Sequence, residues 1–354
     1  MARFPSVAGA LTQEQARQTA ESIAATQLPS GAIPWFDRGH TDPWDHVQSA
    51  MALSATGLTD EAERAYAWSA SNQRPDGSWA IRYRDDAVED AHTDSNFCAY
   101  LATGVWHHWL VTGDLSFART MWPTVARGIE VVLAMQRPDG AIAWARTPSG
   151  IEPEALVTGN ASIHLSLRCA VALAELVGES RPDWELAAGR LRHALDDHPE
   201  AFSHKSTHSM DWYYPLLGGA MDPRRAGSRI DERWSDFVVD GLGARCVSTN
   251  PWVTGAETCE LALALDTLGR TAEARRQLTA MQHLRHDDGS YWTGLVYEDE
   301  ARWPVERTTW TAATVILAAD ALSHTTAAHG LFRGEGLPTP DWKASDSCPC
   351  RASR

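Results

Sequence analysis

The side chains that could do chemistry occur in six short segments, each at the start of a predicted helix. Four of these segments place Trp or Tyr close to a carboxylate, and the other two carry Asp or Asn. Together with Trp35, in the loop before the first segment, the candidate residues are Asp42, Trp44, Asp45, Asp94, Asn96, Asn160, Asp211, Trp212, Tyr213, Glu257, Glu306 and Trp310. Helix capping explains an isolated Asp or Asn at a helix start, but not the aromatic neighbours. Aromatic rings beside several hydrogen-bonding groups on a concave floor bind sugars, so these residues are predicted to hold such a substrate.

The stretch 39–79 shows which elements would position these side chains. Asp42 is a natural N-cap with Pro43 at the first helical position, and apolar residues then recur at helical spacing until Gly57. A second helix begins at Thr59 and ends at an Arg-Pro-Asp-Gly turn, which Trp79 follows. The stretch is therefore predicted to be a helical hairpin followed by a loop that carries an aromatic side chain.

The turn that ends this hairpin is repeated along the chain. Gln-Arg-Pro-Asp-Gly occurs at 73–77 and again at 136–140, and a looser Asp-Asp-Gly copy occurs at 287–289 after Gln282. Each copy follows a predicted helix and precedes a Trp. Three such copies indicate a repeat architecture.

Further hairpins account for most of the remaining chain. Twelve helices are predicted, at 11–27, 42–57, 59–73, 93–112, 114–136, 160–177, 182–195, 209–219, 228–239, 254–268, 271–284 and 306–323. The even-numbered helices are more apolar or richer in small residues, as expected of an inner ring wrapped by the odd-numbered ones. The predicted fold is all-α, an (α/α)6 barrel that forms one domain over 1–330, with a flexible tail at 331–354. All inner helices of such a barrel begin at the same end, so the six segments are expected to meet at one cavity.

Three stretches resemble a known family of enzymes. The segment 100–140 contains Thr112-Gly113-Asp114, Phe117, Met121-Trp122-Pro123 and the closing Gln-Arg-Pro-Asp-Gly, and it resembles the six-hairpin glycosidases, in particular the glucoamylase type. Trp44-Asp45 resembles the position whose Asp binds the non-reducing sugar. The run from Thr309 to Ala313 is similar to the family's Thr-Trp-Ser-x-Ala sequence.

The resemblance implies a glycoside hydrolase that acts on a small glycoside or oligosaccharide with a pair of carboxyl groups. It implies a general acid at Glu154 and a general base at Glu298 or Glu300, with Glu306 as the less similar position. In such a pair a carboxyl group kept protonated by dry surroundings donates to the glycosidic oxygen, and an ionised carboxylate activates water.

Composition limits the partners. A formal net charge of −15 argues against nucleic acid, whose binding relies on Lys and Arg. No apolar run is long enough to span a membrane and the N-terminus lacks a secretory signal pattern, so a cytoplasmic protein is expected. Four cysteines fall in or beside predicted helices and are interpreted as buried apolar groups, whereas Cys348 and Cys350 lie in the tail. No metal or cofactor is predicted, the expected partner is a small carbohydrate, and the oligomeric state is left open.

Three other functions remain as alternatives. The Gln-x-x-Asp-Gly-x-Trp pattern also resembles the repeats of squalene cyclases and prenyltransferase β-subunits, which would imply an isoprenoid substrate and could use Asp85 and Asp86 as a diphosphate site. Epimerases of this barrel class use paired histidines, and the available ones are His46, His107, His108, His164 and His208. The third alternative is a carbohydrate-binding toroid without catalysis. A cavity lined by carboxylates and two or three Trp would favour glycan chemistry, whereas an apolar cavity with few acids would favour an isoprenoid.

Overall fold

The computed structural model of the protein describes residues 4–203 and 205–339. Its α-helices are α1 (Gln13–Thr26), α2 (Pro43–Ala55), α3 (Thr59–Ser71), α4 (Ser95–Thr112), α5 (Leu115–Ala134), α6 (Val157–Val177), α7 (Pro182–Asp197), α8 (Ser209–Tyr213), α9 (Pro223–Glu232), α10 (Trp234–Phe237), α11 (Gly255–Thr267), α12 (Thr271–Ala280) and α13 (Thr309–Ser323). Its 3-10 helices are η1 (Pro199–Ala201), η2 (Tyr214–Gly219), η3 (Met281–Leu284) and η4 (Leu331–Arg333).

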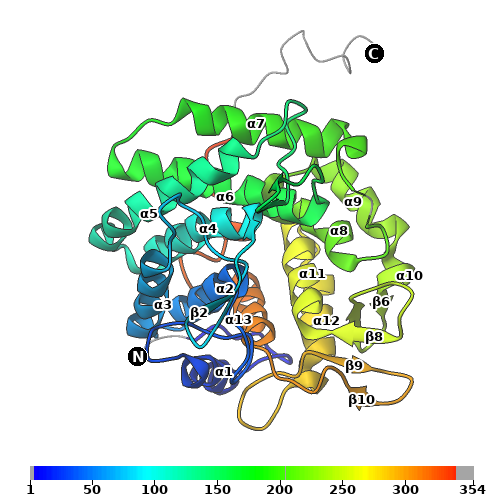
Figure 1. The fold of residues 1–354 in the computed structure, drawn as a ribbon. Helices are drawn as coiled ribbons and strands as arrows, with labels where there is room; N and C mark the ends of the chain where they lie inside the picture. Colours follow the sequence, from blue (N-terminus) through cyan, green and yellow to red (C-terminus); the bar gives the residue numbers. More distant parts are fainter. Residues whose placement is uncertain (1–3, 204, 340–354) are drawn as a thin grey trace.

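Six of these segments form a closed inner ring. α2 packs on α4, α4 on α6, α6 on η2, η2 on α11, α11 on α13, and α13 returns to α2. α1, α3, α5, α7, α9 and α12 pack against this ring from outside (Figure 1). The predicted (α/α)6 barrel is therefore confirmed.

The inner and outer helices differ in burial as the sequence pattern predicts. In α13 every residue from Thr309 to Leu322 is buried, whereas α12 buries only Ala274, Gln277 and Leu278. A helix that faces both the barrel axis and an outer helix must be apolar nearly all round. Within the described residues, no helix is both long and apolar enough to cross a membrane.

Two predicted helices differ from the observed ones. Of the helix predicted at 209–219, only the part up to Tyr213 is α-helical. The chain then continues as the 3-10 helix η2, in which Gly218 has a φ of +66°. A Cβ on Gly218 would lie 2.7 Å from the Cβ of Leu165, so glycine allows a close approach to α6. The helix predicted at 228–239 begins earlier, at Pro223, because the Asp222 carboxylate caps it through the amides of Arg224 and Arg225. It also ends earlier, at Glu232, and after the short α10 residues 238–239 form a strand.

The repeated turns join successive outer helices. The side-chain amide of Gln73 donates to the carbonyl of Gly77 in its own turn (2.9 Å) and to that of Thr124 on α5 (2.8 Å). Gln136 repeats this arrangement with Gly140 and with Ala187 on α7, both at 3.0 Å. In both copies one glutamine ties the end of an outer helix to the next outer helix.

The other copies extend this pattern around the ring. In the third copy the hydroxyl of Thr19 on α1 donates to the carbonyl of Gly289 (2.9 Å), which joins the end of α12 to α1. A fourth copy was not predicted: Gln27 donates to Gly31 (3.0 Å) and to Glu61 on α3 (2.9 Å). Its Gln-x-Pro-x-Gly spacing is the signal in the sequence that could have revealed it.

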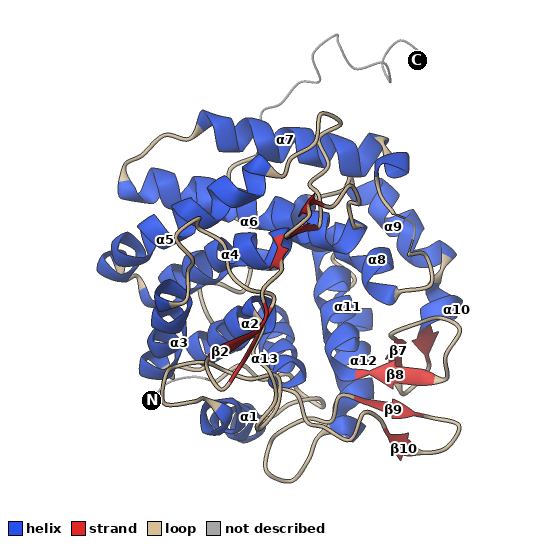
Figure 2. Cartoon of the chain, in the orientation of Figure 1, coloured by secondary structure: helices blue, strands red, loops and turns tan. Residues whose placement is uncertain are grey.

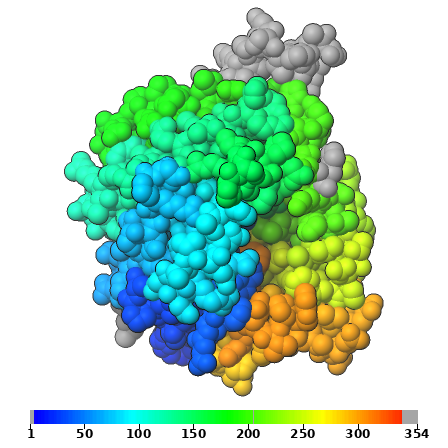
Figure 3. Space-filling model, in the orientation of Figure 1, coloured from blue at the N-terminus to red at the C-terminus, as the bar shows by residue number. Residues whose placement is uncertain are grey.

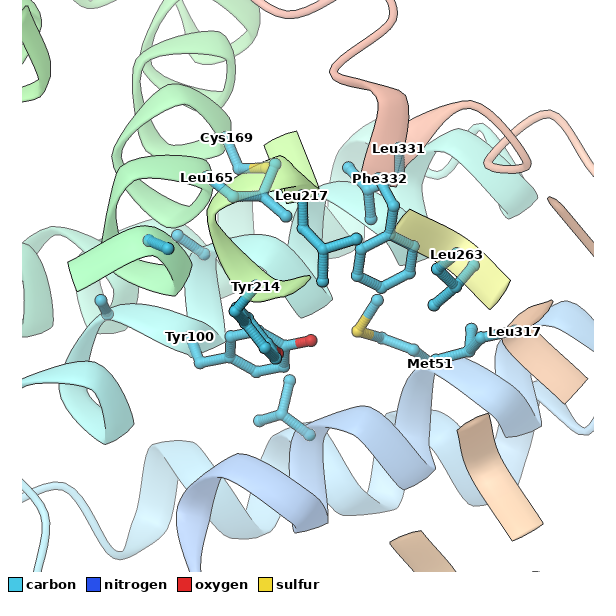
Figure 4. Close-up of a cluster of buried hydrophobic side chains, with 14 of the residues drawn as sticks. Met51, Tyr100, Leu165, Cys169, Tyr214, Leu217, Leu263, Leu317, Leu331 and Phe332 are labelled. Atoms are coloured by element: carbon cyan, nitrogen blue, oxygen red, sulfur yellow. The ribbon is translucent and has the colours of Figure 1, made fainter. Parts of the chain in front are cut away.

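The end of the barrel where the inner helices finish is filled by the C-terminal segment. Leu331, Phe332 and Leu337 are buried there, and Phe332 points among Leu217, Leu263 and Met51 (Figure 4). The tail is predicted to begin at 331, but Leu331, Phe332 and Leu337 are packed in the structure, because the inner ring leaves an apolar opening that they close. Cys348 and Cys350 lie outside the described residues.

Hairpins surround the opposite end, where the inner helices begin (Figure 2). The strands are β1 (Arg82–Arg84), β2 (Ala87–Asp90), β3 (Thr93–Asp94), β4 (Ala145–Thr147), β5 (Gly150–Ile151), β6 (Val238–Val239), β7 (Gly243–Arg245), β8 (Trp252–Thr254), β9 (Gly294–Val296) and β10 (Ala301–Arg302). They pair antiparallel as β1-β2, β3-β4-β5 and β10-β9-β8-β7-β6. β3 leads directly into α4 and β8 into α11. The surface in Figure 3 is hollowed between the blue-to-cyan segments and the yellow-green and orange ones.

Candidate active site

A cavity of about 270 Å³ lies at the end of the barrel where the inner helices begin. Its lining residues are Trp35, His40, Asp42, Trp44, Asp45, Ile81, Arg82, Phe97, Met210 and Trp310. Three tryptophans and two carboxyl groups therefore meet in one space. A cavity lined by carboxyl groups and two or three tryptophans is the kind expected for glycan chemistry rather than for an isoprenoid.

The start of α2 presents two carboxyl groups to the cavity. Asp42 Oδ1 accepts hydrogen bonds from the amides of Trp44 and Asp45, both at 3.0 Å, and this cap fixes the first turn of the helix. Asp42 and Asp45 are each only 7% exposed. Burial raises the pKa of both groups, and the charge of Asp42 raises the pKa of Asp45 further. Asp45 therefore holds its proton to higher pH than an ordinary carboxyl group.

Two more carboxyl groups come from the first turns of α11. Glu257 and Glu260 are three residues apart, so they share one face of the helix. Gln48, one turn after Asp45 on α2, donates from Nε2 to Glu260 Oε1 at 3.4 Å, and the charges of Glu260 and Glu257 raise the pKa of Asp45. The hydroxyl of Tyr213 donates to Glu260 Oε2 at 2.6 Å, and burial raises the pKa of Glu260 to about 8.

The start of α4 adds Asp94 and Asn96. Asp94 Oδ1 accepts from the amides of Asn96 (2.8 Å) and Phe97 (3.2 Å), and burial raises the pKa of Asp94 to about 7. Among the described residues, neither the oxygen nor the nitrogen of the Asn96 amide has a hydrogen-bond partner, and the same is true of Asp42 Oδ2 and Trp44 Nε1. Buried polar atoms are normally paired, so this region is suited to a ligand rich in hydroxyl groups.

The aromatic walls are held by their neighbours. Trp35 Nε1 donates to Glu306 Oε1 at 3.1 Å, and the rings of Trp35 and Trp310 are 5.7 Å apart. The ring of Trp44 meets the ring of Tyr214 edge-on at 5.6 Å. Fixed rings of this kind give a sugar a flat apolar face to stack on at little entropic cost.

The three residues predicted to be catalytic lie on exposed loops. Glu154 is exposed between β5 and α6, and Glu298 and Glu300 are exposed in the turn between β9 and β10. A solvated carboxyl group lacks the dry surroundings that keep a general acid protonated. Glu306 is partly buried beside Trp35, and burial raises its pKa.

Three of the predicted binding residues are engaged with the protein itself. The amide of Asn160 accepts from Ile142 N (2.7 Å) and donates to the carbonyls of Ile142 and Leu156 (both 2.9 Å), so it holds the loop before α6. Asp211 accepts from the hydroxyl of Thr158 at 2.6 Å.

Trp212 points toward the outer helices. Its indole N–H donates to the carbonyl of Arg229 on α9 (2.8 Å), and its ring stacks on Phe237 of α10.

Sequence reasoning missed several residues of the site. Glu260 could have been found from its helical spacing to Glu257, because both fall on one face of α11. Ile81 and Arg82 line the cavity, but they belong to a loop and strand whose proximity to α2 only the folded chain reveals. Met210 lies in one of the six predicted helix starts, but it was not among the candidate residues.

The comparisons with known proteins agree with this geometry. The chain is 61% identical over 349 residues to the MMP endo-(1,4)-3-O-methyl-alpha-D-mannosidase of Mycolicibacterium hassiacum (strain DSM 44199 / CIP 105218 / JCM 12690 / 3849), with 99% of this chain and 97% of that protein covered. The chain belongs to the family of this mannosidase. It is a glycoside hydrolase. No protein-family model matches the sequence.

Solved structures share the fold of this glycoside hydrolase. A glycosidase in complex with glucose aligns with a TM-score of 0.69 at 19% identity, over 87% of this chain and 96% of the other. A D-mannose isomerase aligns with a TM-score of 0.64 at 12% identity, over the same shares of both chains. The predicted resemblance to six-hairpin glycosidases is confirmed.

Two of the residues suggested for the alternative functions, Asp86 and His46, have structural roles. Asp86 Oδ1 accepts from the hydroxyl of Ser30 (2.8 Å) and from the indole of Trp68 (3.0 Å), so it holds the β1–β2 turn. His46 accepts from Ile33 N (3.0 Å) and contacts the carbonyl of Ala65 (2.9 Å), and burial lowers its pKa to about 4. This histidine joins α2 to its neighbours and is held neutral.

Proposed function

We propose that this glycoside hydrolase cleaves internal α-(1→4) bonds in chains of 3-O-methylmannose. The name of the relative that shares 61% of its residues supports this substrate. A cavity with three tryptophans and two carboxyl groups, beside the unpaired polar atoms at the start of α4, supports a sugar ligand.

We assign the general acid to Asp45. Its pKa is raised well above the ordinary range by burial and by the charges of Asp42 and Glu260, and a raised pKa is what a general acid needs. In the proposed reaction Asp45 donates this proton to the glycosidic oxygen as the bond to the anomeric carbon breaks. Asp42 accepts a hydrogen bond from the backbone amide of Asp45 and so fixes its position. The negative charge of Asp42 also favours the protonated form of Asp45.

We assign the second catalytic carboxylate to Glu257. It opens α11, which is separated from α2 in the ring by α13, and Trp310 stands at the start of α13 between them. A sugar on Trp310 would therefore have Asp45 toward one edge and Glu257 toward the other. If Glu257 activates water, the two carboxyl groups should be separated by roughly 6.5–9.5 Å and the anomeric configuration should invert.

Turnover of a defined α-(1→4)-linked 3-O-methylmannose oligosaccharide tests the assignment. Asp45→Asn and Glu257→Gln should each lower kcat by about a thousandfold or more, because each removes one half of the acid–base pair. Glu154→Gln is the matched control and should stay within about twofold of wild type. If Glu154→Gln abolishes turnover and Asp45→Asn does not, the general acid is Glu154 and the proposal is wrong.

A further inference from the structure

The exposed apolar side chains are concentrated around the mouth of the barrel. Of the five large apolar side chains that are most exposed in residues 4–203 and 205–339, four lie on hairpins and loops between an outer helix and the next inner helix: Val88, Ile151, Trp303 and Val305. The fifth, Leu186, lies on the outer helix α7. Exposed apolar side chains that gather around the mouth of a binding cavity indicate a ligand that has apolar surface of its own.

Trp252, Trp303 and Val305 form what we call the rim shelf. The rings of Trp252 and Trp303 meet edge-on at 4.8 Å, and Trp252 Nε1 donates to the carbonyl of Trp303 at 2.8 Å. Trp303 N donates to the carbonyl of Gly294 on β9 at 3.2 Å. The shelf is therefore fixed to the five-stranded sheet, yet Trp303 is 54% and Val305 80% exposed.

The rim shelf lies on chain segments that lead into the helices around the catalytic cavity. Val305 is followed by Glu306, which accepts the hydrogen bond of Trp35 in the cavity wall. Trp252 lies on β8, which leads into α11 and Glu257. Val305 and Glu306 also line a second cavity of about 600 Å³, together with side chains of α1. A glycan that runs out of the catalytic cavity on this side would pass over the shelf.

We propose that the rim shelf binds the 3-O-methyl groups of sugar units remote from the cleaved bond, and so selects methylated over unmethylated chains. This inference rests on the proposed function. A methyl ether replaces a hydroxyl hydrogen with apolar surface that gains from leaving water, whereas an unmethylated mannose presents a hydroxyl to the same shelf and gains little. The selection would be additional to any made inside the catalytic cavity.

The test compares kcat/KM for two α-(1→4)-linked mannose oligosaccharides of equal length, one methylated at O3 and one unmethylated. In Trp303→Ala the preference for the methylated chain should fall about tenfold, mainly through KM, because contacts with about two methyl groups are lost. Val305→Ser should act in the same direction, and Trp303→Tyr should restore most of the preference. Leu186→Ser, an exposed apolar residue far from the mouth, should leave it unchanged.

Other outcomes are distinguishable. If wild type cleaves neither chain, the proposed function fails. If wild type cleaves both and Trp303→Ala keeps the full preference, the proposed function stands and the shelf proposal is wrong. If sedimentation shows that Trp303→Ala loses a self-association while the preference is kept, a second copy of the chain covers the shelf, and the proposal is again wrong.

Discussion

At the scale of single residues, the chemistry depends on carboxyl groups whose pKa values are shifted upward by the barrel. Asp45 and Glu260 are buried in the first turns of inner helices, Asp94 is half-buried at the start of another, and desolvation raises the pKa of all three. In water each would lose its proton near pH 4. The same residue types on the hairpin loops, such as Glu298, remain exposed to solvent. Burial, more than residue type, distinguishes the candidate catalysts from surface acids.

Glu260 allows a prediction on stability and pH. Its pKa rises from 4.5 to about 8 on folding, mainly through burial. Below pH 4.5 both the folded and the unfolded protein hold this proton, so the free energy of unfolding does not change with pH through Glu260 and is at its highest. Between pH 5 and 8 only the folded protein holds it, so the free energy of unfolding falls by about 1.4 kcal/mol per pH unit through this group.

Glu260→Gln should remove this dependence, because glutamine resembles the protonated acid and does not titrate. Urea unfolding of wild type and Glu260→Gln at pH 5, 6, 7 and 8 measures the difference between the two slopes. Asp94 titrates in both proteins and so cancels in the comparison. Loss of the Glu260 charge also lowers the pKa of Asp45, which flattens the curve of the variant further. Parallel curves would show that the Glu260 carboxyl group is not held protonated in the folded protein.

At the scale of elements, α6 acts through Arg168 as the anchor of the closed end of the barrel. The guanidinium group, on a residue only 8% exposed, donates to the carbonyls of Gly218 (2.5 Å), Gly334 (3.2 Å), Leu337 (3.1 Å) and Pro338 (2.9 Å). It joins α6 to η2 and to the C-terminal segment at once. Its planar fork of donors suits this set of carbonyls, which one ammonium group could not serve.

Arg168→Met should lower the free energy of unfolding by about 3 kcal/mol, because it leaves several buried carbonyls without a donor while keeping the apolar stem. Arg168→Lys should recover only part of this loss. Urea unfolding at a single pH measures both variants. Arg276→Met, at an exposed position on α12, is the control and should stay within about 0.5 kcal/mol of wild type. Equal effects of the two Arg→Met changes would contradict the anchoring role.

At the scale of the whole molecule, the repeated turns order the outer helices. Hydrogen bonds tie the end of α1 to α3, the end of α3 to α5, and the end of α5 to α7. Another ties the turn after α12 back to α1, so that late and early parts of the chain are joined. Each turn needs a glycine for two reasons at once. Gly289 has a φ of +89°, and a Cβ there would lie 2.6 Å from the backbone of Gln18 on α1.

Gly289→Ala should therefore cost about 3 kcal/mol of unfolding free energy, since it adds a backbone collision to the cost of a positive φ. Gly113→Ala separates the two effects. Gly113 has a φ of +69° but nothing within 4 Å of its missing Cβ, so the change there should cost about 1 kcal/mol. Thermal and urea unfolding of the two variants measure the difference. Similar losses at both positions would mean that contact between the turn and α1 does not stabilise the ring.

The sequence by itself determined the helices, the order of the hairpins and the family. Caps and turns depend on residues only a few positions apart, so Asp42 at the start of α2 and the Pro-Asp-Gly turns could be recognised directly. The periodic apolar pattern then required a buried inner ring. Asp42, Asp45 and Trp310 could be predicted to share a cavity because the barrel brings all inner helix starts to one end.

Only the tertiary structure decided which of these polar side chains remain available to a substrate. Asn160 and Asn96 have the same chemistry at similar positions, yet Asn160 is occupied by backbone groups of a distant loop and Asn96 is not. Glu154 and Asp45 differ in exposure, which segments far apart in the chain determine together. Desolvation is a property of the assembled surroundings, so it cannot be predicted from the residue and its neighbours in the chain.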